Sequence, residues 1–343
     1  MTKLIIQIPC LNEATSLEAT LSELPGKIDG IDSIEILIID DGSSDETSAV
    51  ARRWGAHHVI RHRTNRGLAA AFQSGLDAAL AAGADVIVNT DADGQYVGAD
   101  IAALIQPILK GEADIVVGDR GVADNAHFGS IKQKLQTAGS AVVRQLSRTA
   151  ITDAVSGFRA ISRDAARRIT ITSDFSYTTD MLIQAGRKRM AIVSVPIRTN
   201  RTERPSRLFK SIPQFIARTL VTMLRAYATY NPLRTFAIIG GLIMLIGLAP
   251  IVRFLWFWLQ GAGDGHVQSL VLGGALLVLG AITCLMAILA DLIGTNRRLA
   301  ERTLESIRQI DERIRWMEAN SAVAKGSQSE ALSEPGRRKS IQA

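Results

Sequence analysis

Two long apolar runs near the C-terminal end restrict the possible folds of this 343-residue chain more than any other feature. Residues 236–259 contain one charged side chain, Arg253, and residues 267–290 contain none. A helix of 24 residues, the length of each run, extends over about 36 Å, which exceeds the roughly 30 Å hydrocarbon core of a bilayer. Buried core helices of soluble proteins, the alternative interpretation, rarely run that far without a polar face. We therefore predict two transmembrane helices, residues 236–259 and 267–290.

The charges around these runs predict how the chain is oriented in the membrane. The connector 260–266 contains no lysine or arginine, whereas arginines flank the outer ends of the runs, at Arg218, Arg225, Arg234, Arg297, Arg298 and Arg302. Positively charged flanks remain in the cytoplasm. The apolar run at residues 3–11 is too short for a signal peptide. We expect a multi-pass protein of the cytoplasmic (inner) membrane, with both termini and the N-terminal domain in the cytoplasm.

The net charge of +6 is concentrated before the first apolar run. Residues 198–234 contain eight lysines and arginines but one acidic residue, Glu203. Because this stretch leads directly into a predicted membrane helix, its expected partner is an anionic membrane surface or a lipid phosphate. The sequence contains no recognisable nucleic-acid-binding motif, so we do not expect a nucleic acid partner.

The first 210 residues have the pattern of an α/β domain. Short apolar, β-branched runs predict strands at residues 4–8, 34–39, 58–60, 86–90 and 115–118. They alternate with predicted helices, among them residues 45–54 and 67–82. Such alternation is typical of a mostly parallel sheet with helices on both faces, which binds ligands at the carboxyl ends of its strands.

These observations divide the chain into five predicted parts. Residues 1–210 form the cytoplasmic α/β domain, and residues 211–232 form an amphipathic helix at the membrane interface. The two-helix transmembrane domain covers residues 233–293. A charged helix follows at residues 294–319, and the polar tail 320–343 is predicted to be disordered.

An acidic turn after the fourth predicted strand carries the strongest chemical signal. Asp91-Ala92-Asp93-Gly94-Gln95 places two carboxylates two residues apart, where both can bind one Mg²⁺ or Mn²⁺ ion together with substrate phosphates. The carbonyl of Gln95 is a possible third ligand. A plain Asx turn is the alternative explanation of this pattern.

A second acidic turn, Asp40-Asp41-Gly42-Ser43, follows the second predicted strand. Its carboxylates are suited to accept hydrogen bonds from a base edge or ribose hydroxyls, or the turn simply leads into a helix capped by Asp45. Neither a G-x-G-x-x-G nor a P-loop motif is present, which argues against a dinucleotide cofactor. The two cysteines, Cys10 and Cys284, lie in unlike surroundings and predict neither a disulfide nor a zinc cluster.

Five segments occur in an order that resembles family 2 glycosyltransferases of the GT-A fold. They are Ile8-Pro9-Cys10-Leu11-Asn12-Glu13, Asp40-Asp41-Gly42-Ser43, Asn65-x-Gly67, Asp91-Ala92-Asp93 and Ser156-Gly157-Phe158-Arg159. The likeness covers about residues 3–215 and is greatest to the branch that makes polyprenyl-phosphate (dolichyl-phosphate) sugars. It implies a Rossmann-like, mostly parallel catalytic domain, a nucleotide-sugar donor and a polyprenyl phosphate acceptor.

The resemblance also implies roles for individual residues. The donor nucleotide would be bound at Pro9, Asn12, Glu13, Asp40, Asp41, Gly42 and Ser43. The metal would be bound by Asp91 and Asp93, with Gln95 as a possible third ligand. The catalytic residues would be Asp91, Asp93, Arg120 and Arg204. The acceptor phosphate would be contacted by Ser156, Arg159, Arg201 and Arg207. Relatives commonly have Gly-x-Ser-Lys where this chain has Arg204-Pro205-Ser206-Arg207.

The expected reaction is a single displacement with inversion at the anomeric carbon. A lipid phosphate is already anionic near neutral pH, so it needs little help from a general base; we interpret Asp180 as structural or supporting. Three alternatives remain open: extension of a lipid-linked glycan, processive polysaccharide synthesis, and a non-catalytic membrane-anchored binding module. Glu312-Arg313-Ile314-Arg315-Trp316 imitates the Q-x-x-R-W motif of processive synthases imperfectly and lies beyond the last predicted span. The transmembrane and C-terminal helices are candidates for homo-oligomer contacts.

Overall fold

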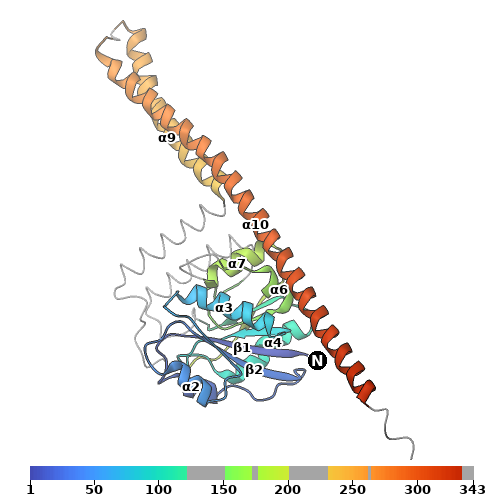
Figure 1. Ribbon diagram of the computed structural model, residues 1–343. Helices are drawn as coiled ribbons and strands as arrows, with labels where there is room; N and C mark the ends of the chain where they lie inside the picture. Colours follow the sequence, from blue (N-terminus) through green and yellow to red (C-terminus); the bar gives the residue numbers. More distant parts are fainter. Residues whose placement is uncertain (122–150, 172–176, 201–230, 262–263, 334–343) are drawn as a thin grey trace, which may run out of the picture. The chain divides into compact units, whose positions relative to one another are not determined.

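The computed structural model describes residues 1–121, 151–171, 177–200, 231–261 and 264–333 of the chain. Its N-terminal part is a seven-stranded sheet with helices packed on it (Figure 1). The strands are β1 (Lys3–Cys10), β2 (Ser33–Asp40), β3 (His58–Arg61), β4 (Val86–Asn89), β5 (Ile115–Asp119), β6 (Arg159–Ser162) and β7 (Ile192–Pro196). The helices of this part are α1 (Leu17–Ser22), α2 (Thr47–Arg53), α3 (Leu68–Ala81), η1 (Gly98–Asp100), α4 (Ile101–Leu109), α6 (Arg163–Arg168) and α7 (Tyr177–Arg187).

The strand order is β3-β2-β1-β4-β6-β5-β7. All adjacent pairs are parallel except those of β6, which runs antiparallel to both β4 and β5. Because β6 is reversed, its first residue, Arg159, pairs with Asn89 at the end of β4. The loop that enters β6 therefore lies at the same edge as the carboxyl ends of the parallel strands.

Two apolar layers cover the two faces of the sheet. Residues of α3, α6 and α7 pack on one face around the buried side chains of Phe72 and Leu76. Residues of α1, α2 and α4 pack on the other face, around Leu17 and Leu104. Strands β1 and β4 are almost entirely buried, as expected for central strands of a parallel sheet covered on both sides.

The predicted α/β class is confirmed, and each of the five predicted strands corresponds to a strand of the sheet. The two predicted helices correspond to α2 and α3. Strands β6 and β7 were not predicted. β6 has four residues and begins with a buried arginine, and β7 has five half-buried or exposed residues, so neither has a strong apolar pattern.

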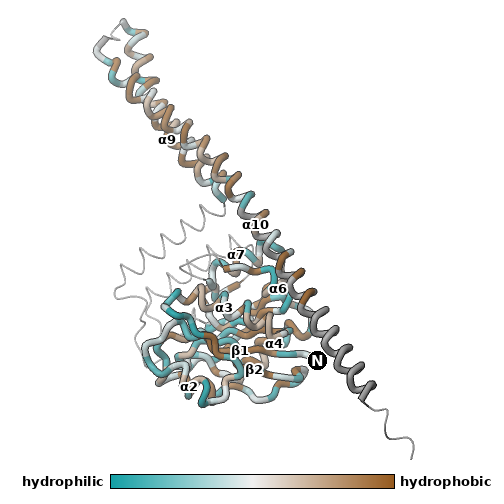
Figure 2. The backbone as a smooth tube through the Cα atoms, in the orientation of Figure 1, coloured by the Kyte–Doolittle hydropathy of each residue, from teal (hydrophilic) through white to brown (hydrophobic). Residues whose placement is uncertain are grey.

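Two helices in the C-terminal part are long and apolar enough to cross a membrane: α9 (Pro232–Leu259) and residues Val267–Asn296 of α10. A short turn, η2 (Asp264–His266), precedes α10. Figure 2 shows the predominance of apolar residues along both. In each, 11% of the most apolar 18-residue window is buried, unlike the core helix of a soluble domain. Their extents include the predicted spans 236–259 and 267–290.

Glycines allow α9 and α10 to approach closely. A Cβ atom at Gly240 would lie 2.8 Å from the carbonyl oxygen of Gly280, and one at Gly273 would lie 2.7 Å from that of Gly247. Real Cβ atoms essentially never come so close, so larger side chains would force the helices apart. Close packing through small residues is typical of helices in membranes, where dispersion contacts replace the hydrophobic effect.

Helix α10 (Val267–Ser333) continues well beyond its apolar part. The chain divides into two units, Met1–Arg298 and Leu299–Ala343, so the end of α10 belongs to the second unit. The helix extends through residues 294–319, for which the sequence predicted a separate charged helix, and through 320–333, for which it predicted disorder. Alanine and glutamate residues in this stretch have high helix propensity. The predicted amphipathic helix 211–232 lies mostly outside the described residues.

Candidate active site

The carboxyl ends of β1, β2 and β4 bring three sequence motifs to one edge of the sheet. Residues 9–13 include the end of β1 and the turn after it, residues 40–45 begin with the last residue of β2, and residues 91–95 come after β4. Residues 91–95 are called the acidic turn below. The loop 153–158 reaches the same edge because β6 runs in the opposite direction. The fold thus assembles four of the segments that the sequence singled out.

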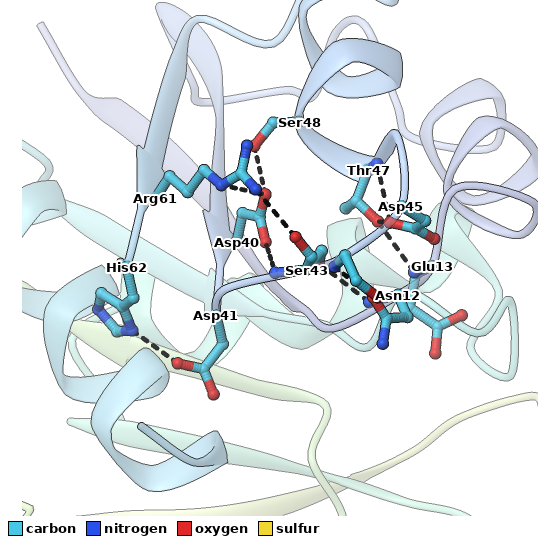
Figure 3. Close-up of polar contacts among 11 residues, drawn as sticks. Asn12, Glu13, Asp40, Asp41, Ser43, Asp45, Thr47, Ser48, Arg61 and His62 are labelled. Atoms are coloured by element: carbon cyan, nitrogen blue, oxygen red, sulfur yellow. Dashed lines mark hydrogen bonds and ion pairs between the residues drawn. The ribbon is translucent and has the colours of Figure 1, made fainter. Parts of the chain in front are cut away.

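Asp40 is a fully buried acceptor of internal hydrogen bonds. Its Oδ1 accepts the amide of Ser43 at 2.7 Å, and its Oδ2 accepts the hydroxyl of Ser48. Nε of Arg61 lies 3.6 Å from Oδ2 (Figure 3). Burial alone would raise the pKa of Asp40, but these hydrogen bonds and the nearby arginine charge lower it below its ordinary value. Asp40 therefore holds the turn rather than presenting a free carboxylate.

Asp41 is also buried and accepts bonds from the chain that leads into α3. Its Oδ1 accepts the amide of Arg66 at 2.9 Å, and its Oδ2 accepts the amide of Gly67 at 2.8 Å. Nδ1 of His62 lies 2.7 Å from Oδ1 (Figure 3). Nε2 of the same ring lies 3.0 Å from the hydroxyl of Ser74. A carboxylate beside these amides favours the start of α3 through the helix dipole.

Gly42 is required by the close approach of two turns. Its φ is 76°, in the left-handed region, and a Cβ atom there would lie 2.6 Å from the carbonyl carbon of Thr64. The residue must therefore be glycine for conformational and steric reasons. The turn after β2 and the turn before α3 form one rigid unit.

Polar contacts also fasten the segment after β1 to this turn. The amide of Asn12 donates to Oγ of Ser43 at 3.0 Å, and Oδ1 of Asn12 accepts the amide of Ser44 at 2.8 Å. The amide of Glu13 donates to Oγ1 of Thr47 at 3.0 Å. Asp45 accepts the amide of Thr47, the first residue of α2, at 3.0 Å, but the N-cap position is Glu46 rather than the predicted Asp45, which lies one residue earlier. Pro9 is buried at the end of β1, while Asn12 is exposed and Glu13 half-buried.

The acidic turn brings its two carboxylates to the end of β4. Asp93 is exposed, and its Oδ1 accepts the amide of Gln95 at 3.0 Å, so the turn is also an Asx turn. Burial among protein atoms, followed by the charge of Asp93, raises the pKa of Asp91 to about 7. The charges of Arg120 and Arg159 act in the opposite direction. Hence Asp91 and Asp93 form a like-charge pair that a cation would relieve.

The loop before β6 packs directly against Asp91. A Cβ atom at Gly157 would lie 2.9 Å from Oδ2 of Asp91 and 3.0 Å from the hydroxyl of Tyr177. The carbonyl of Gly157 accepts Nδ2 of Asn89 at 2.9 Å, and its amide donates to the hydroxyl of Tyr96 at 3.1 Å. Only glycine fits between this carboxylate and the tyrosine, so the loop and the acidic turn are held in fixed proximity.

Arg120 and Asp153 form a buried, two-bond ion pair beside this loop. Nε and one terminal nitrogen of Arg120 donate to the two Asp153 oxygens at 2.7 and 2.9 Å. Burial opposes the charged form of Arg120, but the hydrogen bonds to Asp153 raise its pKa above the ordinary value. Arg120 therefore remains charged near neutral pH and places a cation in the electrostatic environment of Asp91.

Arg159 is buried and its donors are used inside the protein. The guanidinium donates to the carbonyls of Ser156 at 2.8 Å, Thr178 at 2.7 Å and Ala154 at 2.8 Å. Burial lowers its pKa to about 10, so it is charged at neutral pH. Ser156 is also fully buried. This placement differs from the predicted one, because neither side chain is exposed toward an acceptor; Arg159 instead joins the loop before β6 to α7.

The remaining predicted residues have varied positions. Asp180 is buried in the first turn of α7. Arg201, Arg204 and Arg207 lie outside the described residues. Within the described part of the chain, no group of three or more His, Cys, Asp or Glu side chains is arranged to hold a metal ion, so the candidate metal ligands are the two aspartates.

Comparison with known proteins shows the family to which this chain belongs. The model of the family described as Glycosyl transferase family 2 matches residues 5–170. An undecaprenyl-phosphate mannosyltransferase of Micrococcus luteus is 30% identical over 200 residues, covering 55% of this chain and 80% of the relative. An uncharacterized protein of Methanocaldococcus jannaschii is 31% identical over 206 residues, covering 59% and 83%. The chain belongs to glycosyl transferase family 2.

The glycosyltransferase also resembles a further protein in sequence and a solved structure in fold. A UDP-N-acetylglucosamine–dolichyl-phosphate N-acetylglucosaminyltransferase of Methanococcus voltae is 29% identical over 218 residues, covering 57% of this chain and 85% of the relative. Glucosyl-3-phosphoglycerate synthase from Mycobacterium tuberculosis, crystallised with Mn²⁺, UDP and its product, has a TM-score of 0.50 at 20% identity. That alignment covers 65% of this chain and 80% of the synthase. The predicted family and GT-A-like fold are confirmed.

The residues of the acidic turn suit a divalent cation. Two carboxylates and a neighbouring carbonyl are hard oxygen donors, and Mg²⁺ or Mn²⁺ commonly completes its coordination with water and substrate phosphates. The raised pKa of Asp91 reflects burial beside a second carboxylate. The chemistry of Asp91 and Asp93 is therefore suitable for binding a divalent cation in the glycosyltransferase, and Gln95 lies in the same turn.

Several residues of this site were not predicted from the sequence. Asn89, Tyr96 and Tyr177 hold the loop at Gly157, and Asn200 contacts the acidic turn. Asn89 lies in the predicted strand 86–90, close to the acidic turn, which is the one signal that pointed to it. The others come from distant parts of the chain, so their contribution depends on the tertiary fold.

Proposed function

We propose that this glycosyltransferase transfers a sugar from a nucleotide-sugar donor, a UDP- or GDP-sugar, to a polyprenyl phosphate at the cytoplasmic face of the membrane. The observation that carries the proposal is the acidic turn at the carboxyl edge of the sheet, packed against Gly157 and near the Arg120–Asp153 pair. The named activities of the Micrococcus and Methanococcus relatives support the acceptor class. The product would be a polyprenyl-phosphate-linked sugar.

Asp91 and Asp93 would hold Mg²⁺ or Mn²⁺, which when bound neutralises charge on the departing nucleoside diphosphate. The turn after β2 and residues 9–13 would contact the nucleoside from exposed atoms around Asn12 and Glu13. Asp40, Asp41, Gly42 and Ser43 would act by fixing the shape of that edge. Their internal hydrogen bonds preorganise the edge before substrate arrives, which lowers the entropic cost of binding.

The acceptor needs positioning more than deprotonation. A phosphate monoester oxygen is anionic near neutral pH and attacks the anomeric carbon as the bond from that carbon to the diphosphate breaks. Attack opposite to the leaving group inverts the anomeric configuration. Arg120, kept charged by Asp153, would stabilise negative charge near this centre. We further propose that Arg201, Arg204 and Arg207 contact the diphosphate and the lipid phosphate, and that Ser156 and Arg159 support this binding through the loop they hold.

The apolar helices would place the acceptor next to the enzyme. Because α9 and the first part of α10 suit a membrane crossing, a polyprenyl phosphate head group would be available at the bilayer surface. We propose that both termini lie in the cytoplasm, in agreement with the arginines that flank the apolar runs. The two spans and the C-terminal helix would also provide the contacts of a homo-oligomer.

Radiolabelled nucleotide sugars test the proposal directly. Membranes containing the full chain are incubated with polyprenyl phosphate, Mg²⁺ or Mn²⁺ and a panel of labelled UDP- and GDP-sugars. Label extracted into organic solvent identifies the donor and product class, and α- or β-specific glycosidase digestion reports the anomeric configuration. Asp93→Asn should abolish the transfer, whereas the control Asp77→Asn, on exposed α3 surface, should not. Undiminished transfer by Asp93→Asn would exclude the metal assignment, and label entering only polymer would favour a polysaccharide synthase.

A further inference from the structure

The four residues that follow β7 run across the carboxyl edge of the sheet. The amide of Ile197 donates to the carbonyl of Asp119, at the end of β5, at 2.9 Å. Thr199 forms an antiparallel bridge with Tyr96, just after the acidic turn. Residues 197–200, called the strap below, therefore connect the end of β5 to the loop after β4.

An ion pair fastens the middle of the strap. The amide of Arg198 donates to Oδ2 of Asp100 at 2.7 Å, and its Nε donates to Oδ1 at 2.9 Å. Asp100 ends η1 and immediately precedes α4, so it marks the far end of the loop that begins with the acidic turn. The strap thus restrains this loop where it enters a helix.

Asn200 fastens the strap to the acidic turn itself. Its side-chain Nδ2 donates to the carbonyl of Gly94 at 3.0 Å, and its backbone amide donates to the carbonyl of Gln95 at 2.8 Å. These two carbonyls belong to the residues directly after Asp93. The amide of Gln95 also donates to the Asp93 carboxylate, so Asn200 restrains the peptide groups that orient this carboxylate.

From the other side, the turn is held by α1. The hydroxyl of Thr20 donates to the carbonyl of Ala92 at 3.1 Å. The carbonyls of Ala92, Gly94 and Gln95 consequently all have partners, and the backbone of the acidic turn is fixed on both sides of Asp93. Among the described residues of the strap, Asn200 contacts this turn through a side-chain hydrogen bond, and it is exposed at the surface.

We propose that Asn200 is a positioning residue for the divalent cation of this enzyme: it holds the Asp93 carboxylate in the orientation that binds the metal, without itself touching metal or substrate. This inference rests on the metal assignment made under the proposed function. Preorganised ligands bind a cation more tightly because less order must be imposed on binding. Removing the side-chain bond of Asn200 should therefore weaken metal binding while leaving the fold intact.

Binding of Mn²⁺ to the full chain in detergent, measured from the electron paramagnetic resonance signal of free Mn²⁺ with and without UDP, tests this role. Asn200→Ala removes the bond to Gly94 and should raise the Mn²⁺ dissociation constant about threefold to tenfold, the effect expected of one hydrogen bond. Its transfer rate should recover toward the wild-type value at saturating Mn²⁺. The melting temperature without metal should change little, because Asn200 is exposed.

Gln73→Ala is the matched control, since Gln73 on α3 also makes a side-chain bond to a distant backbone group, the amide of Ile171 at 2.7 Å. Its Mn²⁺ affinity should equal that of the wild type; equal losses in both variants would indicate general loosening and overturn the role of Asn200. Unchanged affinity in Asn200→Ala, with loss of binding in Asp93→Asn, would overturn the inference while leaving the proposed function intact. Unchanged Mn²⁺ binding in Asp93→Asn would overturn the metal assignment and the inference with it.

Discussion

Replacement of Arg159 separates its structural role from the acceptor-binding role that the sequence predicted. Arg159→Met retains much of the apolar volume but removes the donors to the carbonyls of Ala154, Ser156 and Thr178. A hydrogen bond from a charged group contributes about 1.5–3 kcal/mol, so we expect a loss of at least about 4 kcal/mol. For a domain of this size, that loss corresponds to a fall in melting temperature of about 8–16 °C. Arg159→Lys, which can satisfy fewer carbonyls, should show an intermediate fall.

The buried thiol of Cys10 provides the assay. In a Cys284→Ala background, a thiol-reactive fluorophore reports unfolding of the domain, since Cys10 is 3% exposed in the folded chain. The control Arg53→Met removes an exposed arginine paired with Glu46 at 3.7 Å and should change the melting temperature little. A melting temperature of Arg159→Met equal to that of the wild type, with a raised KM for polyprenyl phosphate, would refute the structural role and restore the predicted one.

Three further predictions follow from contacts elsewhere in the domain. Hydrogen bonds from neighbouring lysine and histidine side chains lower the pKa of Glu35, so its stabilisation exists above about pH 4.3 and is lost as pH falls through the lowered value. Glu35→Gln should reduce the unfolding free energy by about 1 kcal/mol at pH 7 but not near pH 2 in chemical denaturation, and equal losses at both would contradict this. Gly157→Ala should displace the Asp91 carboxylate, because the added Cβ atom would lie 2.9 Å from Oδ2, and should weaken Mn²⁺ binding measured by electron paramagnetic resonance. A wild-type Mn²⁺ affinity would show that the loop moves to accommodate the methyl group without disturbing the metal ligands. Burial raises the pKa of the Cys10 thiol, so little of the reactive thiolate is present at pH 8. Mass spectrometry should therefore find Cys10 unmodified by iodoacetamide until the chain unfolds, and rapid labelling of the folded chain would contradict this prediction.

The strands that could be predicted are those whose own residues form a continuous apolar run, which indicates burial without reference to distant parts of the chain. β1, β2 and β4 are runs of apolar, β-branched residues between polar turns, and their alternation with helices indicates a parallel sheet. β6 could not be recognised in this way, because its position and direction depend on pairing with β4 and β5, which come from distant parts of the chain. The polar composition after residue 293 led to the prediction of a separate charged helix and a disordered tail, whereas the structure continues α10 to Ser333.

The same distinction applies to the candidate site. Strand ends predicted that the motifs would share one edge, and the structure brings them to that edge. The sequence did not indicate which carboxylates remain available there. Asp41 is surrounded by amides of the turn before α3, and Arg159 by carbonyls, and both facts depend on how separate loops fold together. Asn200 had no sequence signal, because its partners are backbone carbonyls, which every residue has.

The ion pair between Arg120 and Asp153 has a consequence for how β5 and β6 are held together. Arg120 directly follows β5 and Asp153 lies in the loop before β6, and a second bond joins the hydroxyl of Thr152 to the carboxylate of Asp119. Because these bonds join the end of β5 to the chain just before β6, the two neighbouring antiparallel strands are clamped together at the edge of the sheet that carries the acidic turn.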